Sequence, residues 1–298
     1  MPINSLPNSP HTRDLIREGT VRIGGDLFAR RTCEYLLSGL LGVGRTALYL
    51  EEKEVDERFS RHFFSLLERV QKKEPLQYIL EKAFFWEEEY RVTPATLIPR
   101  PSTELLVKAC LDYFGGETQP EKDERNLLFI DIGTGCGCIA ISLTRKVLCS
   151  KMLAIDRSQE ALQVARGNAL RYGVSERISW LCGDLFSPLR RGSFEADAIL
   201  SNPPYVPTEE IESLPLEVLH EPRLALDGGK EGLFYYQRIA AEGSFFLKEG
   251  GFLFVEIGDG QSEPIESIFS ETSFRLIGTR KDLEAIPRVM IFQKTGRG

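Results

Sequence analysis

Residues 127–137, LLFIDIGTGCG, decide the fold of this chain. The mostly apolar stretch Leu127–Ile132 predicts a buried strand, and the three glycines after it allow a tight turn because they carry no Cβ atom. A helical pattern starts directly behind the loop. In an open α/β sheet the ligand crevice lies at the carboxyl ends of the strands, which is where this loop falls. We therefore expect a strand, a ligand-facing glycine loop and a helix.

After this loop, short apolar strands alternate with amphipathic helices. The further strands that we predict are Met152–Asp156, Ile178–Cys182, Ala196–Ser201 and Phe252–Ile257. Such alternation is typical of a parallel, doubly wound α/β sheet. Two more predicted strands, Phe274–Thr279 and Arg288–Gln293, leave little room for a helix between them. They fit an antiparallel pair added to the edge of the sheet.

The N-terminal part of the chain has a different pattern. Apolar residues recur at helical spacing at Ala29, Cys33, Leu36 and Leu40, and again at Val55, Phe59, Phe63, Leu66 and Val70. Residues 1–80 are therefore expected to form a small helical domain behind a frayed tail. Residues 81–101 predict a hairpin around Glu87–Glu89 and a stiff connector that contains Pro94, Pro99 and Pro101. The α/β domain is expected to span residues 102–298.

Composition narrows the class of protein. A chain of 298 residues suggests about two domains at roughly 150 residues each. With 37 Lys and Arg against 44 Asp and Glu, the net charge is −7, which argues against broad non-specific binding to nucleic acid. No apolar run approaches the ~20 residues that span a bilayer, and the first residues lack the apolar core of a secretory signal. Six cysteines are too few for a disulfide scaffold, so we expect a reduced, cytoplasmic protein.

The glycine loop reads G-x-G-x-G, whereas a dinucleotide site prefers G-x-G-x-x-G with a pyrophosphate at the helix N-terminus. Asp156 closes the second predicted strand, and its two oxygens can accept hydrogen bonds from both hydroxyls of a ribose. Asp184 and Leu185 follow the third strand, where they could meet an adenine with one polar acceptor and an apolar flank. This set favours a nucleoside ligand without phosphates, and S-adenosylmethionine is the obvious candidate.

The alternative is a plain strand-to-helix turn at residues 133–137, with Asp156 as a solvated strand end. The glycine loop alone leaves that alternative open, but the loop and Asp156 together favour the nucleoside cofactor. Cys136 and Cys138 are not spaced like zinc ligands, and the histidines are scattered along the chain, so no metal is expected.

A second chemical motif, Asn202-Pro203-Pro204-Tyr205, follows the fourth predicted strand. The side-chain oxygen of Asn202 and the carbonyl of Pro203 can accept both N–H bonds of a planar amide or amino nitrogen, while Tyr205 packs on its plane. Such acceptors aim a poor nucleophile at an electrophilic methyl group and favour the positive charge that grows on the nitrogen. No general base is needed before methyl transfer. An inert proline-rich turn is the alternative interpretation.

The first strand, the G-x-G-x-G loop, Asp156 and the Asn-Pro-Pro-Tyr motif resemble class I S-adenosylmethionine-dependent methyltransferases that act on exocyclic or amide nitrogens. Other segments resemble the peptide chain release factor glutamine methyltransferases. These segments are EPLQYI at 74–79, Phe85-Trp86, TLIPRP at 96–101 with Thr103-Glu104, Glu221-Pro222, Ala225-Leu226, Gly228-Gly229, Lys281-Asp282 and Arg288-Val289. The resemblance covers the chain from about residue 74 to residue 293.

This resemblance implies a Rossmann-like class I methyltransferase sheet with an antiparallel edge, and a helical substrate-docking domain at residues 1–80. It implies methyl transfer from S-adenosylmethionine, leaving S-adenosylhomocysteine, to the glutamine amide of a Gly-Gly-Gln motif in class I release factors, which modulates translation termination. The candidate cofactor residues are then Gly133, Thr134, Gly135, Cys136, Gly137, Asp156, Asp184, Leu185 and Asn202, and the candidate glutamine site is Asn202, Pro203, Pro204 and Tyr205. Neither a membrane nor a direct nucleic-acid substrate is expected.

Three residues depart from the usual pattern of that family. Ser102 stands in place of an acidic residue, Glu81 in place of a glycine, and Leu185 in place of an aromatic neighbour of the adenine, for which Phe186 could compensate. Two rival functions stay open. An adenine-N6 methyltransferase on DNA or RNA would use the same Asn-Pro-Pro-Tyr motif but would need a basic track and stacking platforms. A non-catalytic S-adenosylmethionine-binding scaffold would have no need of the acceptors at Asn202.

Overall fold

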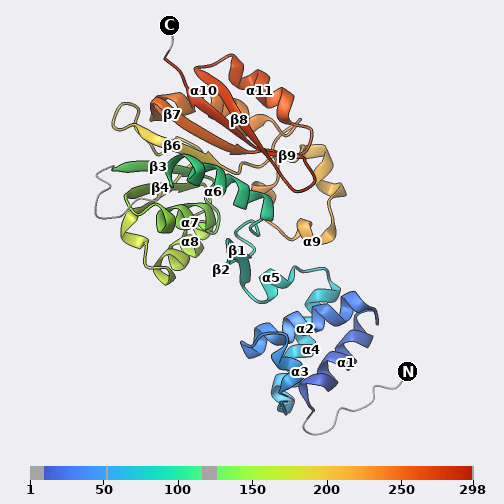
Figure 1. The fold of residues 1–298 in the computed structure, drawn as a ribbon. Helices are drawn as coiled ribbons and strands as arrows, with labels where there is room; N and C mark the ends of the chain where they lie inside the picture. Colours follow the sequence, from blue (N-terminus) through green and yellow to red (C-terminus); the bar gives the residue numbers. More distant parts are fainter. Residues whose placement is uncertain (1–9, 52, 116–125, 297–298) are drawn as a thin grey trace. The chain divides into compact units, whose positions relative to one another are not determined.

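The computed structural model describes residues 10–51, 53–115 and 126–296, which belong to two compact units (Figure 1). The smaller unit holds Met1–Glu81 together with Pro215–His220, and the larger unit holds Lys82–Leu214 and Glu221–Gly298. The chain therefore passes from one unit to the other three times. The frayed tail that we expected lies outside the described residues, and the division into docking, connector and catalytic segments stays a prediction.

The smaller unit is helical, as the spacing of apolar residues predicts. Its helices are α1 (Thr12–Arg22), α2 (Leu27–Leu41), α3 (Ala47–Leu50), α4 (Glu57–Gln71), α5 (Leu76–Ile79) and α9 (Leu216–Leu219). Asp26 and Asp56 cap α2 and α4, since each carboxylate accepts a hydrogen bond of 2.7 Å from a backbone N–H in the first turn. The predicted apolar faces meet in one core that includes Cys33, Leu36 and Phe63.

The short helix α9 is distant in sequence from the rest of the smaller unit. The carboxylate of Glu217 pairs with the ammonium of Lys73 at 3.4 Å, and Nε2 of His220 lies 3.1 Å from the carbonyl oxygen of Lys72. These contacts tie the segment to the residues that follow α4. No pattern in the sequence predicts this grouping.

A seven-stranded sheet forms the centre of the larger unit, in the order β5-β4-β3-β6-β7-β9-β8 (Figure 1). The strands are β3 (Leu127–Ile132), β4 (Ser150–Asp156), β5 (Ile178–Cys182), β6 (Ala196–Ser201), β7 (Leu247–Glu256), β8 (Phe274–Lys281) and β9 (Pro287–Lys294). Neighbours from β5 to β7 are parallel, whereas β9 runs antiparallel to both β7 and β8. The predicted doubly wound sheet with an antiparallel edge is confirmed.

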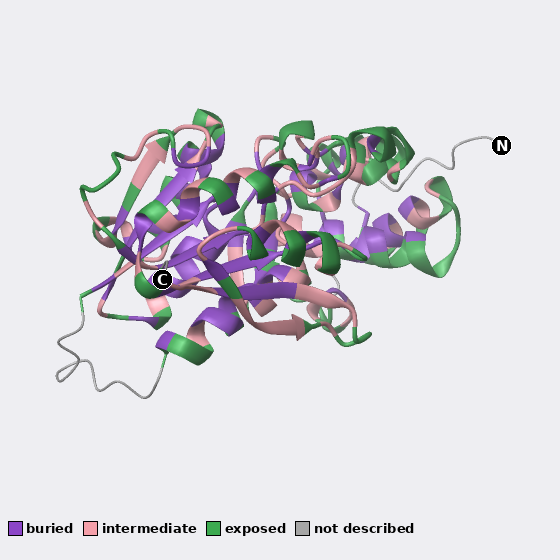
Figure 2. Ribbon diagram, turned by 90° about the horizontal axis from the view of Figure 1, so that it is seen from above, coloured by how far each residue is buried: buried purple, intermediate pink, exposed green. Residues whose placement is uncertain are grey.

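Helices and 3₁₀ turns cover and connect these strands. The α-helices are α6 (Pro101–Phe114), α7 (Cys138–Lys146), α8 (Gln159–Arg171), α10 (Phe234–Glu242) and α11 (Ser262–Ser270), and the 3₁₀ turns are η1 (Ser175–Arg177), η2 (Thr208–Ser213), η3 (Arg223–Ala225) and η4 (Gly243–Phe246). The central strands β3 and β6 are mainly buried, and Figure 2 shows both buried and exposed residues on the helices. In the described part of the chain, no helix is long and apolar enough to cross a membrane.

The predicted hairpin is present as β1 (Lys82–Phe85) and β2 (Glu88–Arg91). Its turn lies slightly earlier than the acidic triplet suggested, because Trp86 and Glu87 adopt φ values of 51° and 66°. Asn168 of α8 fastens this hairpin to the glycine loop. Its side chain accepts from the Arg91 N–H at 2.8 Å and donates to the carbonyl oxygens of Arg91 at 3.0 Å and Cys136 at 2.9 Å.

Candidate functional site

The strand order reverses between β3 and β6, the two neighbours at the centre of the sheet. From β3 the chain builds outward through β4 and β5, and from β6 it builds in the opposite direction through β7. Ile132 pairs with Ser201, whose hydroxyl donates to the Ile132 carbonyl oxygen at 2.9 Å, so Gly133 and Asn202 leave the sheet side by side. Ligands of open α/β sheets bind at such a reversal point.

A cavity of about 270 Å³ opens at this edge. It brings together the predicted residues Gly133, Thr134, Gly135, Cys136, Asp156, Asp184, Leu185, Asn202, Pro203 and Pro204. Gly137 and Tyr205 are not among the described residues that line it. The cavity wall also contains residues from the proline-rich connector, including Thr96 and Pro99, and from the first turn of α6, where Thr103 lies.

The backbone explains the G-x-G-x-G spacing. Gly133, Gly135 and Gly137 have φ values of 74°, 56° and 83°, a left-handed conformation that side chains disfavour. Gly137 also needs space, because a Cβ atom there would lie 3.1 Å from the Cβ of Ala165. Gly137 therefore shapes the loop and its packing on α8, although it does not line the cavity.

Asp156 is held by backbone donors at the end of β4. Its Oδ2 accepts from the Gly135 N–H at 2.8 Å and its Oδ1 from the Ser158 N–H at 2.9 Å. Burial raises the pKa of Asp156, and the two N–H donors act in the opposite direction. Each carboxylate oxygen keeps a second lone pair, so the group can still accept hydrogen bonds from a ligand.

Asp184 and Leu185 form the far wall of the cavity. The Asp184 carboxylate pairs with the guanidinium of Arg238 on α10 at 2.7 Å, which uses one of its two oxygens. Leu185 has a φ of 49°, so the chain turns sharply at this point. The suggestion that Phe186 compensates for Leu185 is wrong: Phe186 stacks on Phe246, with 5.1 Å between ring centroids, inside the core.

Asp131, the last polar residue of β3, is completely buried below the loop. Its Oδ2 accepts from the Thr134 hydroxyl at 2.6 Å, and its Oδ1 has no hydrogen-bond partner among the described residues. Burial raises the pKa of this carboxyl to about 7. A buried acceptor of this kind suits a ligand that brings a donor or a positive charge.

Asp131 also makes a prediction about stability. Because its pKa is higher in the folded than in the unfolded chain, the folded state binds more protons, and the free energy of unfolding falls as pH rises from about 4 to about 7. Thermal melts of the cofactor-free protein should therefore show wild type losing more stability than Asp131→Asn between about pH 5 and about pH 8. Parallel curves for the two proteins would contradict this.

The Asn202 side chain has a defined orientation. Its Nδ2 donates to the hydroxyl oxygen of Thr103 at 3.0 Å. The side-chain amide has only one carbonyl oxygen, so this bond leaves Oδ1 as the free acceptor of Asn202. An available Oδ1 is what Asn202 needs in order to accept a hydrogen bond from an N–H group, as predicted from the sequence.

Close backbone packing fixes the rest of the Asn-Pro-Pro-Tyr loop. Gln261 donates from Nε2 to the Tyr205 carbonyl oxygen at 3.0 Å. A Cβ atom on Gly232 would lie 2.2 Å from that same oxygen, and one on Gly228 would lie 2.7 Å from the Tyr205 Cα. The loop can keep this course only because both positions are glycine.

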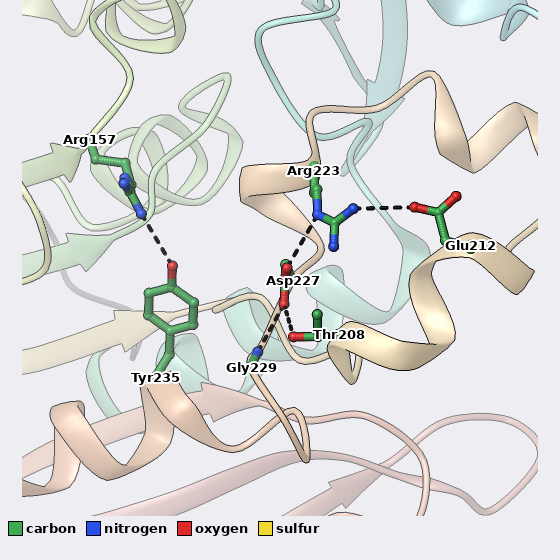
Figure 3. Close-up of polar contacts among 7 residues, drawn as sticks. All are labelled: Arg157, Thr208, Glu212, Arg223, Asp227, Gly229 and Tyr235. Atoms are coloured by element: carbon green, nitrogen blue, oxygen red, sulfur yellow. Dashed lines mark hydrogen bonds and ion pairs between the residues drawn. The ribbon is translucent and has the colours of Figure 1, made fainter.

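Side-chain contacts brace the segment from β6 to α10 (Figure 3). The Asp227 carboxylate accepts from the Thr208 hydroxyl at 2.6 Å, from the Gly229 N–H at 3.1 Å and from Arg223 at 3.3 Å. These bonds, that of Thr208 first, hold the pKa of Asp227 below its usual value. On the opposite side, Arg157 points toward the Tyr235 hydroxyl, 3.5 Å away (Figure 3).

Three residues in and around the site were not predicted as functional candidates from the sequence. Thr103 contacts Asn202, and Glu256 accepts from the Ser102 hydroxyl at 2.7 Å. Glu221 accepts from the Ile98 N–H at 3.0 Å and from Arg100 at 2.5 Å, which fixes the connector. Thr103 and Glu221 fall in segments that carry the family resemblance, whereas Glu256 was marked only as part of the predicted strand Phe252–Ile257. Each contact joins residues far apart in the sequence.

Comparisons with known proteins agree with this geometry. Residues 14–80 match the PrmC N-terminal domain family and residues 117–233 the methyltransferase small domain family. A release factor glutamine methyltransferase of Geobacter sulfurreducens is 38% identical over 264 residues, which is 88% of each chain. The chain belongs to the release factor glutamine methyltransferase family. A second member, from Thermodesulfovibrio yellowstonii, is 35% identical and covers 90% of this chain and 94% of its own.

A solved structure supports the fold of this family member. The crystal structure of a methyltransferase from Pyrococcus furiosus has a TM-score of 0.51 and 18% identity, covering 71% of this chain and 91% of its own. At that identity the likeness concerns the fold alone. It agrees with the class I methyltransferase sheet described above.

Members of this family are S-adenosylmethionine-dependent, and the cavity suits that cofactor. S-adenosylmethionine carries a sulfonium cation, an amino group and ribose hydroxyls, and no phosphate. The carboxylates of Asp156 and Asp184 supply acceptors in the cavity wall. These two carboxylates fit a cationic, donor-rich ligand better than a phosphate, which their negative charge would repel.

Tyr205 offers a prediction about its role. Burial, with help from the Glu256 carboxylate, raises the pKa of its hydroxyl to about 12, so the group stays neutral and takes no proton. We assign the ring to packing. Tyr205→Phe should keep kcat/KM within about threefold of wild type, whereas Tyr205→Ala should lose about tenfold or more. Steady-state methyl transfer measures both, and greater tolerance of alanine than of phenylalanine would refute the packing role.

Proposed function

We propose that this protein transfers a methyl group from S-adenosylmethionine to the side-chain amide nitrogen of the glutamine in a Gly-Gly-Gln motif of class I peptide chain release factors. The observation that supports it best is the orientation of Asn202, whose Nδ2 is engaged by Thr103 and whose Oδ1 is available. An acceptor of this polarity is what an amide NH₂ group requires. The release factor relatives supply the identity of the macromolecule.

In the proposed site, Gly133–Gly137 and Asp156 would hold the cofactor, and Asp184 and Leu185 would flank its base. When bound, S-adenosylmethionine supplies an electrophilic methyl group. Asn202 Oδ1 and the Pro203 carbonyl oxygen would accept the two N–H bonds of the glutamine amide and direct its nitrogen. The two oxygen dipoles point at the nitrogen where positive charge develops, so they stabilise the transition state more than the ground state.

The position of Asn202 next to Gly133 matters for this role. The two residues follow paired strand ends, with Ile132 opposite Ser201, so the glutamine site and the cofactor loop share one cavity. The helical unit is proposed to contribute the docking surface for the release factor. Its family match over residues 14–80 supports that assignment.

An assay of labelled methyl transfer tests the proposal. The acceptors are a class I release factor, its variant with Gly-Gly-Ala in place of Gly-Gly-Gln, and duplex DNA. We expect label on the wild-type factor only. Label on DNA would instead support an adenine methyltransferase, and label on the Gly-Gly-Ala variant would move the modified atom away from the glutamine. Cofactor binding without any transfer would favour a scaffold.

A further inference from the structure

The contact between Asn202 and Thr103 depends on a third group. A threonine hydroxyl has one proton and can accept as well as donate. Because Nδ2 of Asn202 donates to Thr103 Oγ1, the hydroxyl proton of Thr103 must point elsewhere. Whatever receives that proton decides which end of the Asn202 amide faces the cavity.

Glu256 is placed to receive it. It is the last residue of β7, next to β6 in the sheet, and Ser201 pairs with Val255, so Glu256 and Asn202 leave adjacent strands together. Its side chain is fully buried, and its Oε1 accepts from the Ser102 hydroxyl at 2.7 Å. Burial raises the pKa of Glu256, and hydrogen bonding by the Thr103 and Ser102 hydroxyls lowers it.

Several neighbouring groups oppose the effect of burial on this carboxyl group. Ser102 and Thr103 lie in the first turn of the 14-residue helix α6, where free backbone N–H groups favour a nearby negative charge. Arg100 and Arg288 act in the same direction through their positive charges. The second carboxylate oxygen, Oε2, has no hydrogen-bond partner among the described residues. Glu256 therefore accepts through one oxygen and holds a second buried oxygen close to the start of α6 without a partner among the described residues.

We propose that Glu256 is a positioning residue for the methyl acceptor, acting through Thr103 on Asn202. Glu256 accepts the Thr103 proton, Thr103 then accepts from Asn202 Nδ2, and Asn202 presents Oδ1 to the incoming amide. This inference rests on the proposed function, since a glutamine amide is the group that Oδ1 would hold. It extends that function with a residue that does not line the cavity.

The direction of these bonds is what Glu256 controls. In Glu256→Gln the new side chain has an NH₂ group that can donate to Thr103. Thr103 could then donate to Asn202, whose amide would turn and present Nδ2 to the acceptor. Two donors would face each other, and the substrate amide would lose its acceptor.

Kinetics of matched variants test this chain of contacts. Thr103→Val removes the hydroxyl at nearly constant volume, whereas Thr103→Ser keeps it. We expect kcat for release factor methylation to fall about 30-fold in Thr103→Val and in Glu256→Gln, and to stay within about threefold in Thr103→Ser. Cofactor Kd and the KM for the factor should stay within about threefold in all of them. Ser102→Ala, which removes the other hydroxyl on Glu256, is the control and should lose less than about fivefold.

The double variant Thr103→Val/Glu256→Gln separates a shared route from two independent effects. If both residues act through Asn202, the double variant should be no slower than the slower single variant within about threefold. The proposal would be overturned if the fold-losses in kcat of the two single variants multiplied in the double variant. An unchanged kcat in Thr103→Val, or a loss in Thr103→Ser equal to that in Thr103→Val, would overturn it as well.

A measurement made without any methyl acceptor tests this inference independently of the proposed function. In a ¹⁵N spectrum the side-chain NH₂ signal of Asn202 is identified by its absence in Asn202→Asp. We expect its exchange with solvent to quicken at least about tenfold in Thr103→Val and in Glu256→Gln but not in Thr103→Ser. Unchanged exchange in the first two variants would overturn the inference. A wild-type protein that labels no release factor would overturn the proposed function and leave this result to stand on its own.

Discussion

Asn202→Ala is expected to lower kcat for release factor methylation by about 10²–10³-fold while cofactor affinity stays nearly unchanged. The side chain supplies Oδ1, one of the two acceptors that we assign to the glutamine amide, and its loss removes stabilisation that grows as charge develops on the nitrogen. Its Nδ2 contact with Thr103 shows that the side chain is fixed before substrate arrives. The whole loss should therefore fall on the chemical step.

Single-turnover transfer from saturating cofactor measures the rate, and calorimetric titration with S-adenosylhomocysteine measures binding. Asn126→Ala is a matched control, because Asn126 is exposed just before β3, at the opposite end of that strand from the site. It should behave like wild type in both experiments. Wild-type turnover of Asn202→Ala would remove Asn202 from the glutamine site.

Asp156→Ala is expected to weaken cofactor binding by about 10²-fold, with kcat close to wild type once cofactor saturates. The carboxylate would lose its hydrogen bonds to the ribose hydroxyls, each strong because the acceptor is charged. It would also release the Gly135 N–H at 2.8 Å, which helps to hold the glycine loop in its left-handed course. Both effects raise the dissociation constant.

Equilibrium titration of the cofactor checks this prediction. Asp156→Asn, which keeps one acceptor oxygen, should lose less affinity than Asp156→Ala. Asp112→Ala is the control, since that carboxylate makes only a surface pair with Arg280 at 3.3 Å, worth at most about 1 kcal/mol. Unchanged affinity in Asp156→Ala would mean that the ribose lies elsewhere.

Features that depend on a single strand, helix or turn were the ones that the sequence predicted best. The predicted bounds of β3, β5 and β6 agree with the structure because each is a short, mostly apolar run followed by a glycine or by Asn202-Pro203. Ser158, a residue type preferred at helix N-termini, caps α8 by accepting from the Ala161 N–H at 3.1 Å. Glycine-loop geometry was predictable for the same reason, since left-handed φ values select glycine.

Contacts between distant segments were not predictable in this way. Nothing in the apolar pattern shows that β9 enters the sheet between β7 and β8, because a hairpin can add either strand first. The Thr103 contact with Asn202 spans 99 positions, and that of Ser102 with Glu256 spans 154. Phe186 illustrates the remaining error: Leu185 and Phe186 both pack in the core, but of the two it is Leu185 that also lines the cavity.

The chain crosses between the two units three times, so a single cut cannot separate them and a single fusion cannot transplant one of them. A clone that starts at Lys82 would still encode α9, yet it would lack Lys73 and Lys72, the partners of Glu217 and His220. Transplanting the helical unit onto another methyltransferase scaffold would need a terminal fusion and, in addition, an internal insertion of Pro215–His220. The two units are therefore interlaced along the chain. Exchange of the N-terminal segment alone would leave Glu217 and His220, in the loop that follows β6, without their partners.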